Sequence, residues 1–262
     1  CGADFNIDPS AVEKAITKHT RGIMPVHLTG RPAPMDEINA LAAERNIHVI
    51  EDAAQAIGAR YRGKRVGGLG TAAGFSLHPL KNLGIYGDGG MIATDNAELA
   101  AILRKLRNHG LRNRDECEIW GFNSRLDTMQ AAFAEIKLSH LDGWNHRCRE
   151  IASIYRTGMQ EFVRVPVDQP WEECVYHNFI IRSDRRDALA AHLLHGGVDT
   201  RVHYPVPIHL QQAAGYLGYC EGDFPNAERD TQTMLSLPIY PELTEDQIRH
   251  VAQTVLEFVE KA

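Results

Sequence analysis

The chain has 262 residues, of which 44% are apolar and 24% charged, as in ordinary globular proteins. It carries 28 Lys and Arg against 34 Asp and Glu, and the net charge of −6 argues against a nucleic-acid-binding surface. No run of 18 or more apolar residues occurs, so we expect no membrane span. The five scattered cysteines form no CxxC pair, which argues against a disulfide framework and indicates a reducing, cytoplasmic compartment.

The first third of the chain alternates between predicted helices and strands. A helix is expected to start at Asp8, an N-cap residue followed by proline. A buried strand is predicted over residues 22–28, a helix over residues 34–46 and a second strand over residues 48–50. This alternation predicts βαβ units and a mostly parallel sheet flanked by helices.

Two of the predicted strands end in polar residues. The strand over residues 48–50 runs into Glu51 and Asp52, and a second apolar run ends at His78, followed by Lys81 and a cluster of glycines. Parallel strands of open α/β sheets present ligand-binding residues at their carboxyl ends. We therefore expect Asp52 and Lys81 to meet at one rim of the sheet.

A lysine and an acid at one rim suit pyridoxal phosphate (PLP). This cofactor needs a lysine amine for its Schiff base and an acid that keeps its pyridine nitrogen protonated. Ser76 and the glycine-rich turn after Lys81 offer hydroxyl and backbone donors to a phosphate. The residues alone leave another interpretation open, in which Asp52 caps a helix and Lys81 is a solvated loop cation.

The middle of the chain contains one expected long helix. Asn96 is predicted to cap a shorter helix, and residues 109–127 are polar and irregular. The long helix is expected to begin at residue 128 and to continue to about residue 162. A bend is predicted within it, near residues 141–143.

This bend divides the chain into a large PLP-binding domain, residues 1–142, and a smaller C-terminal domain, residues 143–262. The smaller domain is predicted to be α+β, with strands over residues 174–183 and 197–204 and a helix between them. Thr244 begins a capping box that opens the closing helix.

Several collinear motifs, which span nearly the whole chain, resemble one family. They are EDAAQAIGARYRGKRVGGLGTAAGFSLHPLKNLGIYGDGGMIATD, PVHLTGRPAPMDEI, WGFNSRLDTMQAA, YPVPIHLQ, DFPNAE and LSLPIYPELT. They resemble the sugar aminotransferases of the DegT/DnrJ/EryC1/StrS group. The resemblance implies an aspartate-aminotransferase-like α/β fold (the PLP-transferase fold), a PLP cofactor and a homodimer with shared active sites. Members usually carry a further amino-terminal segment with a phosphate clamp, so we expect an upstream part to be missing here.

The resemblance also implies roles for individual residues. Lys81 resembles the Schiff-base lysine that shuttles the proton, and Asp52 is similar to the acid at the pyridine nitrogen. Gln55 resembles the amide that contacts the phenolic oxygen or ring face of the cofactor. Ser76 resembles a phosphate-binding hydroxyl, and Asn123 an asparagine that reaches the cofactor phosphate of the neighbouring subunit. Dehydrating relatives have histidine in place of the lysine, so Lys81 favours transamination.

Further candidates for substrate contact are His78, Tyr86, Asp88, Arg125, Tyr204 and His209. Each has a structural alternative. His78 lines the sugar pocket or caps a strand end, and Asp88 meets sugar hydroxyls or only forms an Asp-Gly turn. Arg125 binds a carboxylate or phosphate, or makes a surface ion pair. No HxH or HExxH spacing points to a histidine metal site.

The predicted function is PLP-dependent transfer of an amino group, by family analogy from glutamate, to a nucleotide-linked keto-sugar. The motifs look most like those of members that act on 3-keto sugars. One alternative is a non-catalytic or truncated PLP-fold protein with a regulatory or binding role. Another, a Rossmann-type nucleotide-sugar binder or epimerase, is disfavoured because no GxGxxG follows the first strand.

Overall fold

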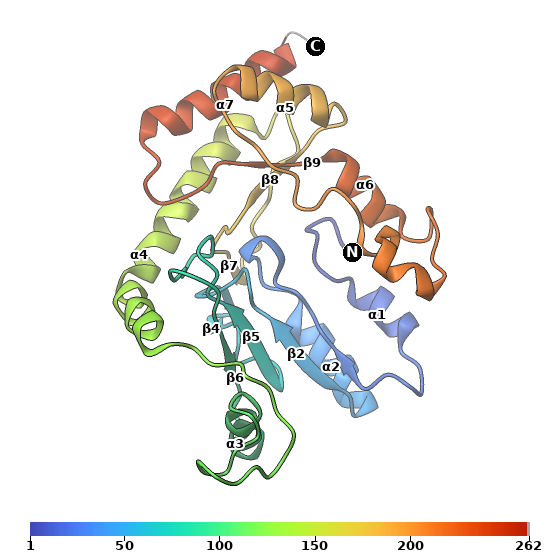
Figure 1. The fold of residues 1–262 in the computed structure, drawn as a ribbon. Coiled ribbons are helices and arrows are strands. Elements are labelled where there is room, and N and C mark those ends of the chain that lie inside the picture. Colours follow the sequence, from blue (N-terminus) through green and yellow to red (C-terminus); the bar gives the residue numbers. More distant parts are fainter. Residues whose placement is uncertain (261–262) are drawn as a thin grey trace.

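A sheet and its helices form the N-terminal part of the protein, and a second group of helices around a two-stranded sheet forms the C-terminal part (Figure 1). The computed structural model describes residues 1–260. The helices are α1 (Pro9–Ala15), α2 (Met35–Arg45), α3 (Ala97–Leu106), α4 (Thr128–Met159), α5 (Arg186–His195), α6 (Pro225–Thr233) and α7 (Glu245–Glu260), with 3-10 turns η1 (Leu28–Gly30), η2 (Ile208–Leu210) and η3 (Gln212–Leu217). The strands are β1 (Gly22–Ile23), β2 (His48–Asp52), β3 (Arg60–Tyr61), β4 (Lys64–Arg65), β5 (Ala72–Ser76), β6 (Gly90–Ala93), β7 (Glu172–Glu173), β8 (Phe179–Arg182) and β9 (Met234–Leu237).

The main sheet has the strand order β1-β2-β5-β6. Strands β1, β2 and β5 are parallel, with Asp52 opposite Gly74, and β6 returns antiparallel at the edge, with Gly90 opposite Ser76. The predicted α/β class and its parallel strands are confirmed. The parallel pairing of β2 with β5 brings their carboxyl ends to the same rim, as expected.

The first predicted strand is shorter than expected. Regular pairing of β1 with β2 stops at Ile23, because Pro25 has no backbone N–H to donate. Pairing resumes at Val26, which forms an isolated bridge with Asp52, and the His27 N–H donates to the Asp52 carbonyl oxygen at 3.0 Å. The segment therefore still follows β2 to the rim of the sheet.

Three predicted helix caps are confirmed. The Asp8 carboxylate accepts the Ser10 N–H at 2.9 Å, and Asn96 Oδ1 accepts the Leu99 N–H at 2.9 Å. At the start of α7, the Thr244 N–H donates to Gln247 Oε1 and the Gln247 N–H donates to Thr244 Oγ1. These reciprocal bonds are those of a capping box.

Helix α4 connects the two parts of the protein. The expected bend near residues 141–143 does not break it, because the 32-residue helix continues through Gly143. A glycine costs a helix only about 1 kcal/mol relative to alanine, which a long packed helix tolerates. The second half buries Ile151, Tyr155 and Met159 in the C-terminal core, whereas the first half is largely exposed. None of the helices within residues 1–260 is long and apolar enough to cross a membrane.

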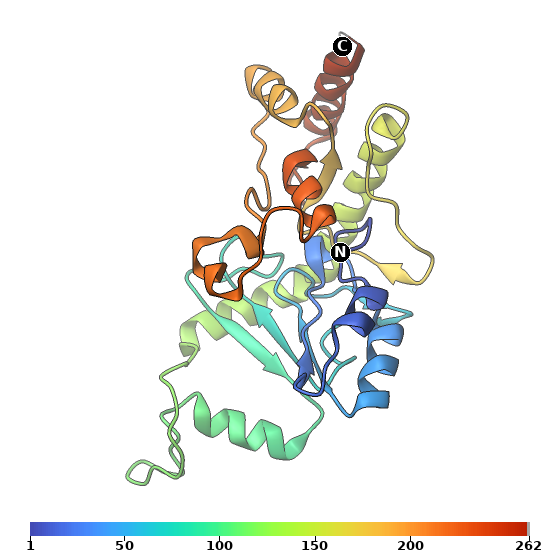
Figure 2. The same cartoon turned by 90° about the vertical axis from the view of Figure 1, so that its right-hand side faces the viewer.

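The C-terminal core lies between the antiparallel pair β8–β9 and helices α4, α5 and α7 (Figures 1 and 2). The strand expected over residues 197–204 is wrong. Only Arg201 of that segment pairs, in one isolated bridge to Ser236, because β9 takes the place beside β8. β9 itself was not predicted, since its four buried residues follow α6 without a turn signal.

Candidate active site

Asp52 and Lys81 lie at the same rim of the main sheet. Asp52 is the last residue of β2, and Lys81 lies in the turn that follows β5, the parallel neighbour of β2. The Lys81 N–H donates to the His78 carbonyl oxygen at 2.9 Å, which closes that turn. The Asp52 carboxylate accepts the Ala54 N–H at 3.0 Å. The parallel strands thus bring an acid and an amine together from different parts of the chain.

The Lys81 amine is partly buried. Burial lowers the pKa of Lys81 below its ordinary value, and the nearby Asp52 carboxylate opposes this shift. A lowered pKa leaves more of the amine neutral near pH 7 than in a surface lysine. Neutral amine is the form that attacks a carbonyl carbon.

Asn82 anchors the turn that carries Lys81. Its side-chain amide donates to Asn145 Oδ1 on α4 at 2.9 Å and to the Val175 carbonyl oxygen at 3.0 Å. Gly84 is required further along the turn, since a Cβ there would lie 2.3 Å from the Pro79 carbonyl oxygen. The position of Lys81 is therefore fixed by contacts with both the long helix and the segment before β8.

Gln55 and Tyr204 come together although 149 positions separate them. Gln55 is buried, its Oε1 accepts the Thr29 N–H at 2.7 Å, and its Nε2 donates to the Tyr204 hydroxyl at 3.3 Å. The structure thus brings a predicted cofactor residue next to a predicted substrate residue.

His177 is a candidate site residue that sequence reasoning missed. Burial is the main cause that lowers its pKa to about 4, and the charges of Lys81 and His203 lower it further. His177 therefore lies within electrostatic reach of the Lys81 amine and is neutral at physiological pH. A lone histidine before a strand gives no sequence signal. His177 comes near Lys81 only because the chain, 96 residues after Lys81, passes the same rim of the sheet again.

Ser76 and His78 lie beside the turn that carries Lys81, and their side chains accept hydrogen bonds from neighbouring backbone N–H groups. Ser76 ends β5, and its Oγ accepts the His78 N–H at 3.3 Å. The exposed His78 ring accepts the Leu80 N–H through Nδ1 at 3.2 Å. A phosphate-binding role for Ser76 and a substrate contact by His78 stay predictions.

Of the other candidates, Tyr86 and His209 pack against other parts of the chain, and Asp88 is exposed. Tyr86 is 68% exposed, and its ring packs against Phe133 of α4. Asp88 is exposed in the following turn. His209 is buried against α6, where its Nε2 lies 2.9 Å from Glu228 Oε1.

Asn123 and Arg125 lie on the irregular segment between α3 and α4. This segment projects from the rest of the chain (Figure 2). The Arg125 Nε donates to Asn123 Oδ1 at 3.1 Å, and both side chains are exposed. Such a position leaves them available to a neighbouring molecule, and their predicted roles stay untested.

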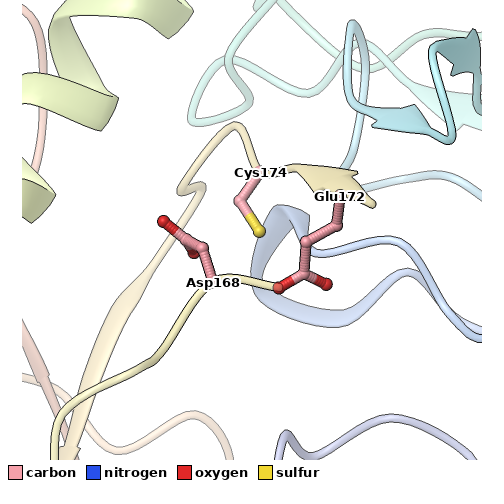
Figure 3. A group of neighbouring side chains, drawn as sticks. All are labelled: Asp168, Glu172 and Cys174. Atoms are coloured by element: carbon pink, nitrogen blue, oxygen red, sulfur yellow. The ribbon is translucent and has the colours of Figure 1, made fainter. Parts of the chain in front are cut away.

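Asp168, Glu172 and Cys174 form a further cluster, in which each residue turns a possible metal ligand toward the others (Figure 3). Arg31 bonds to Glu172 at 2.5 Å and approaches Asp168 at 3.4 Å, and Arg156 donates to Asp168 at 2.6 Å. Burial raises the pKa of Cys174 above its usual range. Two guanidinium groups therefore already bond to the two carboxylates, and the cluster links Arg31 to the 168–174 segment.

Comparisons with known proteins agree with the fold. The model of the DegT/DnrJ/EryC1/StrS aminotransferase family matches residues 2–256. The chain is 48% identical to the dTDP-3-amino-3,4,6-trideoxy-alpha-D-glucose transaminase of Streptomyces venezuelae over 97% of its own length and 68% of that protein. It is also 48% identical to the "Pleiotropic regulatory protein" of Geobacillus stearothermophilus, over 97% of this chain and 69% of that protein.

A solved structure carries the same fold. The crystal structure of S. venezuelae DesV, in complex with a ketimine intermediate, superposes with a TM-score of 0.96 at 47% identity. The match covers 98% of this chain and 70% of DesV. The sheet, the two parts of the protein and the predicted motifs therefore agree with one assignment: the chain belongs to the DegT/DnrJ/EryC1/StrS aminotransferase family.

Proposed function

We propose that the protein transfers an amino group from glutamate to a nucleotide-linked keto-sugar, with PLP as cofactor. The observation that carries the proposal is the partly buried Lys81 amine, whose positive charge is stabilised by the Asp52 carboxylate at the end of the neighbouring strand β2. The S. venezuelae relative named above acts on a dTDP-linked amino sugar, which supports the substrate class. A 3-keto sugar is the preferred substrate, because that relative and an Acidithiobacillus ferrooxidans relative are named for amino transfer at C3.

The residues at the rim fit PLP. The cofactor needs an amine that is neutral in part, an acid for its ring nitrogen and polar groups around the ring. The pKa of Lys81 is lowered, the Asp52 carboxylate is close enough to influence it, and Gln55, three residues after Asp52, holds a fixed side-chain amide. When bound, PLP supplies an electron-withdrawing ring that stabilises negative charge on the reacting carbon.

Each residue of the site then has a distinct task. The neutral form of Lys81 binds the cofactor and, once free, takes and returns the proton of the reacting carbon as general base and acid. Asp52 keeps the ring nitrogen protonated, because a carboxylate favours a nearby positive charge. Gln55, held by Thr29 and Tyr204, orients the ring.

A Lys81→Ala variant tests the proposal. The wild-type protein with PLP should show a visible absorption band that shifts when glutamate is added, and should convert a keto-sugar nucleotide to the amino-sugar. The variant should lose both the band and turnover. Lys64→Ala, which removes an exposed cation of β4, is the matched control and should leave both unchanged. Normal turnover by Lys81→Ala would remove the basis of the proposal.

A non-catalytic regulatory role is the second candidate. The specific observation in its favour is the 48% identity to a protein named a pleiotropic regulatory protein. A regulator would bind PLP or a sugar nucleotide without converting it. If glutamate leaves the absorption band of the wild-type protein unchanged, this second function replaces the first.

We also propose that the protein works as a homodimer with shared active sites. Large apolar side chains are strongly exposed on the 107–127 segment and on the first half of α4, among them Trp120 at 95%, Phe122 at 70% and Met129 at 71%. Exposed apolar groups gathered in one region mark interaction surfaces. Light scattering should give twice the chain mass, and Trp120→Glu with Met129→Glu should shift it toward the monomer.

A further inference from the structure

A cavity of about 420 Å³ lies in the C-terminal part of the protein, at the end of β8 that points away from the candidate active site. β8 begins two residues after His177 and ends at Arg182, which lines the cavity. The N-terminal residues, the loop after α4, the end of β8, α6 and the end of α7 all contribute to its walls. None of the described lining residues is a candidate for the PLP site.

The cavity is lined by an excess of positive charge. Four arginines contribute to it, namely Arg164, Arg182, Arg185 and Arg229. Among the described lining residues, only Asp184 carries a carboxylate. Arg182 is neutralised from outside the lining, since its Nε lies 2.9 Å from Asp230 Oδ1, whereas the other three arginines form no ion pair within residues 1–260. The described lining therefore has an excess of two positive charges.

Two of these arginines lie directly opposite each other. Arg164 and Arg182 form an isolated antiparallel bridge, in which the Arg182 N–H donates to the Arg164 carbonyl oxygen at 3.0 Å. Opposite residues of such a bridge project their side chains from the same face, and like charges placed there destabilise the pairing. An anion bound between the two guanidinium groups would replace this repulsion with attraction.

Aromatic rings hold two of the arginines in place. The Arg182 guanidinium lies 3.8 Å from the centroid of the Phe5 ring, and the Arg185 guanidinium lies 4.7 Å from that of Phe258. Such contacts orient a guanidinium without neutralising its charge or using its in-plane N–H donors. Both groups are therefore ordered before a ligand arrives, which lowers the entropy that binding costs.

The rest of the lining is partly apolar. Phe162, Val163, Phe258 and Val259 belong to it, and the Phe162 side chain is 45% exposed. The cavity has the volume of a small-molecule site, far more than a single phosphate group fills. An inorganic anion would leave the exposed ring uncovered, whereas an aromatic group attached to the anion would stack on it.

We propose that this cavity is a second binding site, separate from the PLP site, for a phosphate monoester that carries an aromatic group, such as a nucleoside monophosphate. The charge of a phosphate monoester at pH 7, about −1.5 to −2, matches the positive excess. The planar guanidinium groups of Arg164 and Arg185 each suit two phosphate oxygens, and Phe162 offers a surface for the base. The site does not depend on the amino-transfer function.

Equilibrium dialysis with AMP tests the proposal on protein that has been saturated with PLP and then freed of the excess. Inorganic phosphate and adenosine are the comparison probes. The wild type should bind AMP more tightly than either, and salt should weaken this binding by screening the charges. Arg164→Gln and Arg185→Gln should each weaken AMP about 10-fold, as expected when a charge-assisted hydrogen bond is lost. Phe162→Ala should weaken AMP about 10-fold without changing the binding of inorganic phosphate.

A control and a second readout separate a ligand site from a solvated patch of arginines. Arg45→Gln removes an exposed arginine of α2 and should leave AMP binding unchanged. In thermal unfolding without ligand, Arg164→Gln should raise the melting temperature, because it removes the repulsion from Arg182. AMP should raise the melting temperature of the wild type but not that of a variant that combines Arg164→Gln with Arg185→Gln.

Three results would overturn the proposal. The first is that the wild type does not bind AMP. The second is that the wild type and both arginine variants bind AMP equally well, which would place AMP elsewhere on the protein. The third is that AMP and inorganic phosphate bind with the same affinity and Phe162→Ala changes neither, which would show that the cavity takes up an adventitious ion only.

Discussion

The Asp52 carboxylate raises the pKa of Lys81 against the lowering effect of burial, although the two residues leave different strands. The pair is brought together by the parallel alignment of β2 and β5, so no local turn has to connect them. Asp52 therefore has one effect before the cofactor binds and another afterwards. Without cofactor it stabilises the charged amine, and with cofactor it is available to the ring nitrogen.

The Asp52→Asn variant should reveal both effects. In the cofactor-free protein, the pKa of Lys81 should fall further, because the amide cannot stabilise the ammonium charge. The rate at which an amine-specific reagent modifies Lys81, followed by mass spectrometry against pH, measures this. In the PLP-loaded protein, turnover should fall by more than about 100-fold, as expected when charge stabilisation is lost at the reacting centre. Asp95→Asn, at an exposed position before α3, should change neither value.

The lowered pKa of Lys81 predicts a pH-dependent cost to stability. The unfolded chain binds the proton more tightly than the folded chain, so folding stability should rise with pH between the folded pKa and about 10.5. Lys81→Met removes this group and should raise the melting temperature of the cofactor-free protein at pH 7. The difference between variant and wild type should shrink as the pH approaches 10.5. A difference that is constant from pH 6 to pH 10 would contradict a lowered pKa.

The position of Asp52 and Lys81 at one rim of the sheet could be predicted from sequence, because the residue patterns that mark strand ends are local. A β-branched run that ends in acids, and another that ends in a lysine turn, identify strand ends, and parallel pairing then joins them. The same reasoning named Asp52 of the two adjacent acids, and the structure gives the physical difference between them. Successive side chains of a strand point to opposite faces, so Glu51 enters the core while Asp52 reaches the rim.

The rest of the site depends on contacts that sequence spacing does not encode. His177 comes within electrostatic range of Lys81 because the segment before β8 returns to the sheet, where the Val175 N–H donates to the Gly30 carbonyl oxygen at 2.9 Å. Tyr86 and Asn123 are exposed because no other part of the single chain, within residues 1–260, covers their side chains. Local patterns predict elements and caps, whereas these placements are set by tertiary packing.

Glu51 should be a strong determinant of stability. Its side chain is fully buried, and its carboxylate accepts His27 Nε2 at 3.0 Å and the N–H groups of Gly67, Leu69 and Gly70 at 2.7 Å. Burial alone raises the pKa of Glu51, but these hydrogen bonds outweigh it and the pKa is lowered. The stabilisation should therefore be complete above about pH 4.5 and be lost as the pH falls through the folded pKa.

The Glu51→Gln variant tests this in urea. It should lower the free energy of unfolding at pH 7 by about 2–4 kcal/mol, because the amide replaces a charged acceptor with a donor beside the 67–70 loop. The loss should become smaller at pH 3, because below the ordinary carboxyl pKa of 4.5 the unfolded chain takes up a proton at Glu51 more readily than the folded protein does. Glu44→Gln, at an exposed position of α2, should have no measurable effect. A loss that stays the same at both pH values would show that shape, and not charge, is what matters at this position.

Gly30 holds the Gln55 and His177 sides of the site together. Its φ of +89° is unfavourable for residues with a Cβ, and a Cβ there would lie 2.8 Å from Val175 Cγ2, 2.9 Å from the His177 nitrogen and 3.0 Å from the Gln55 carbonyl oxygen. Gly30→Ala should lower the free energy of unfolding by about 2–4 kcal/mol, from backbone strain and overpacking combined.

Gly63→Ala separates the two contributions. Gly63 has a φ of +78° and no atom within 4 Å of a Cβ, so this variant has the strain without the clash. Gly63→Ala should lower the free energy of unfolding by about 1 kcal/mol and leave PLP affinity unchanged. Gly30→Ala should cost more and also weaken PLP, measured by fluorescence titration, because Gln55 and His177 are pushed apart. Equal losses in both variants, with normal PLP affinity, would show that the backbone contact at Gly30 does not position the site.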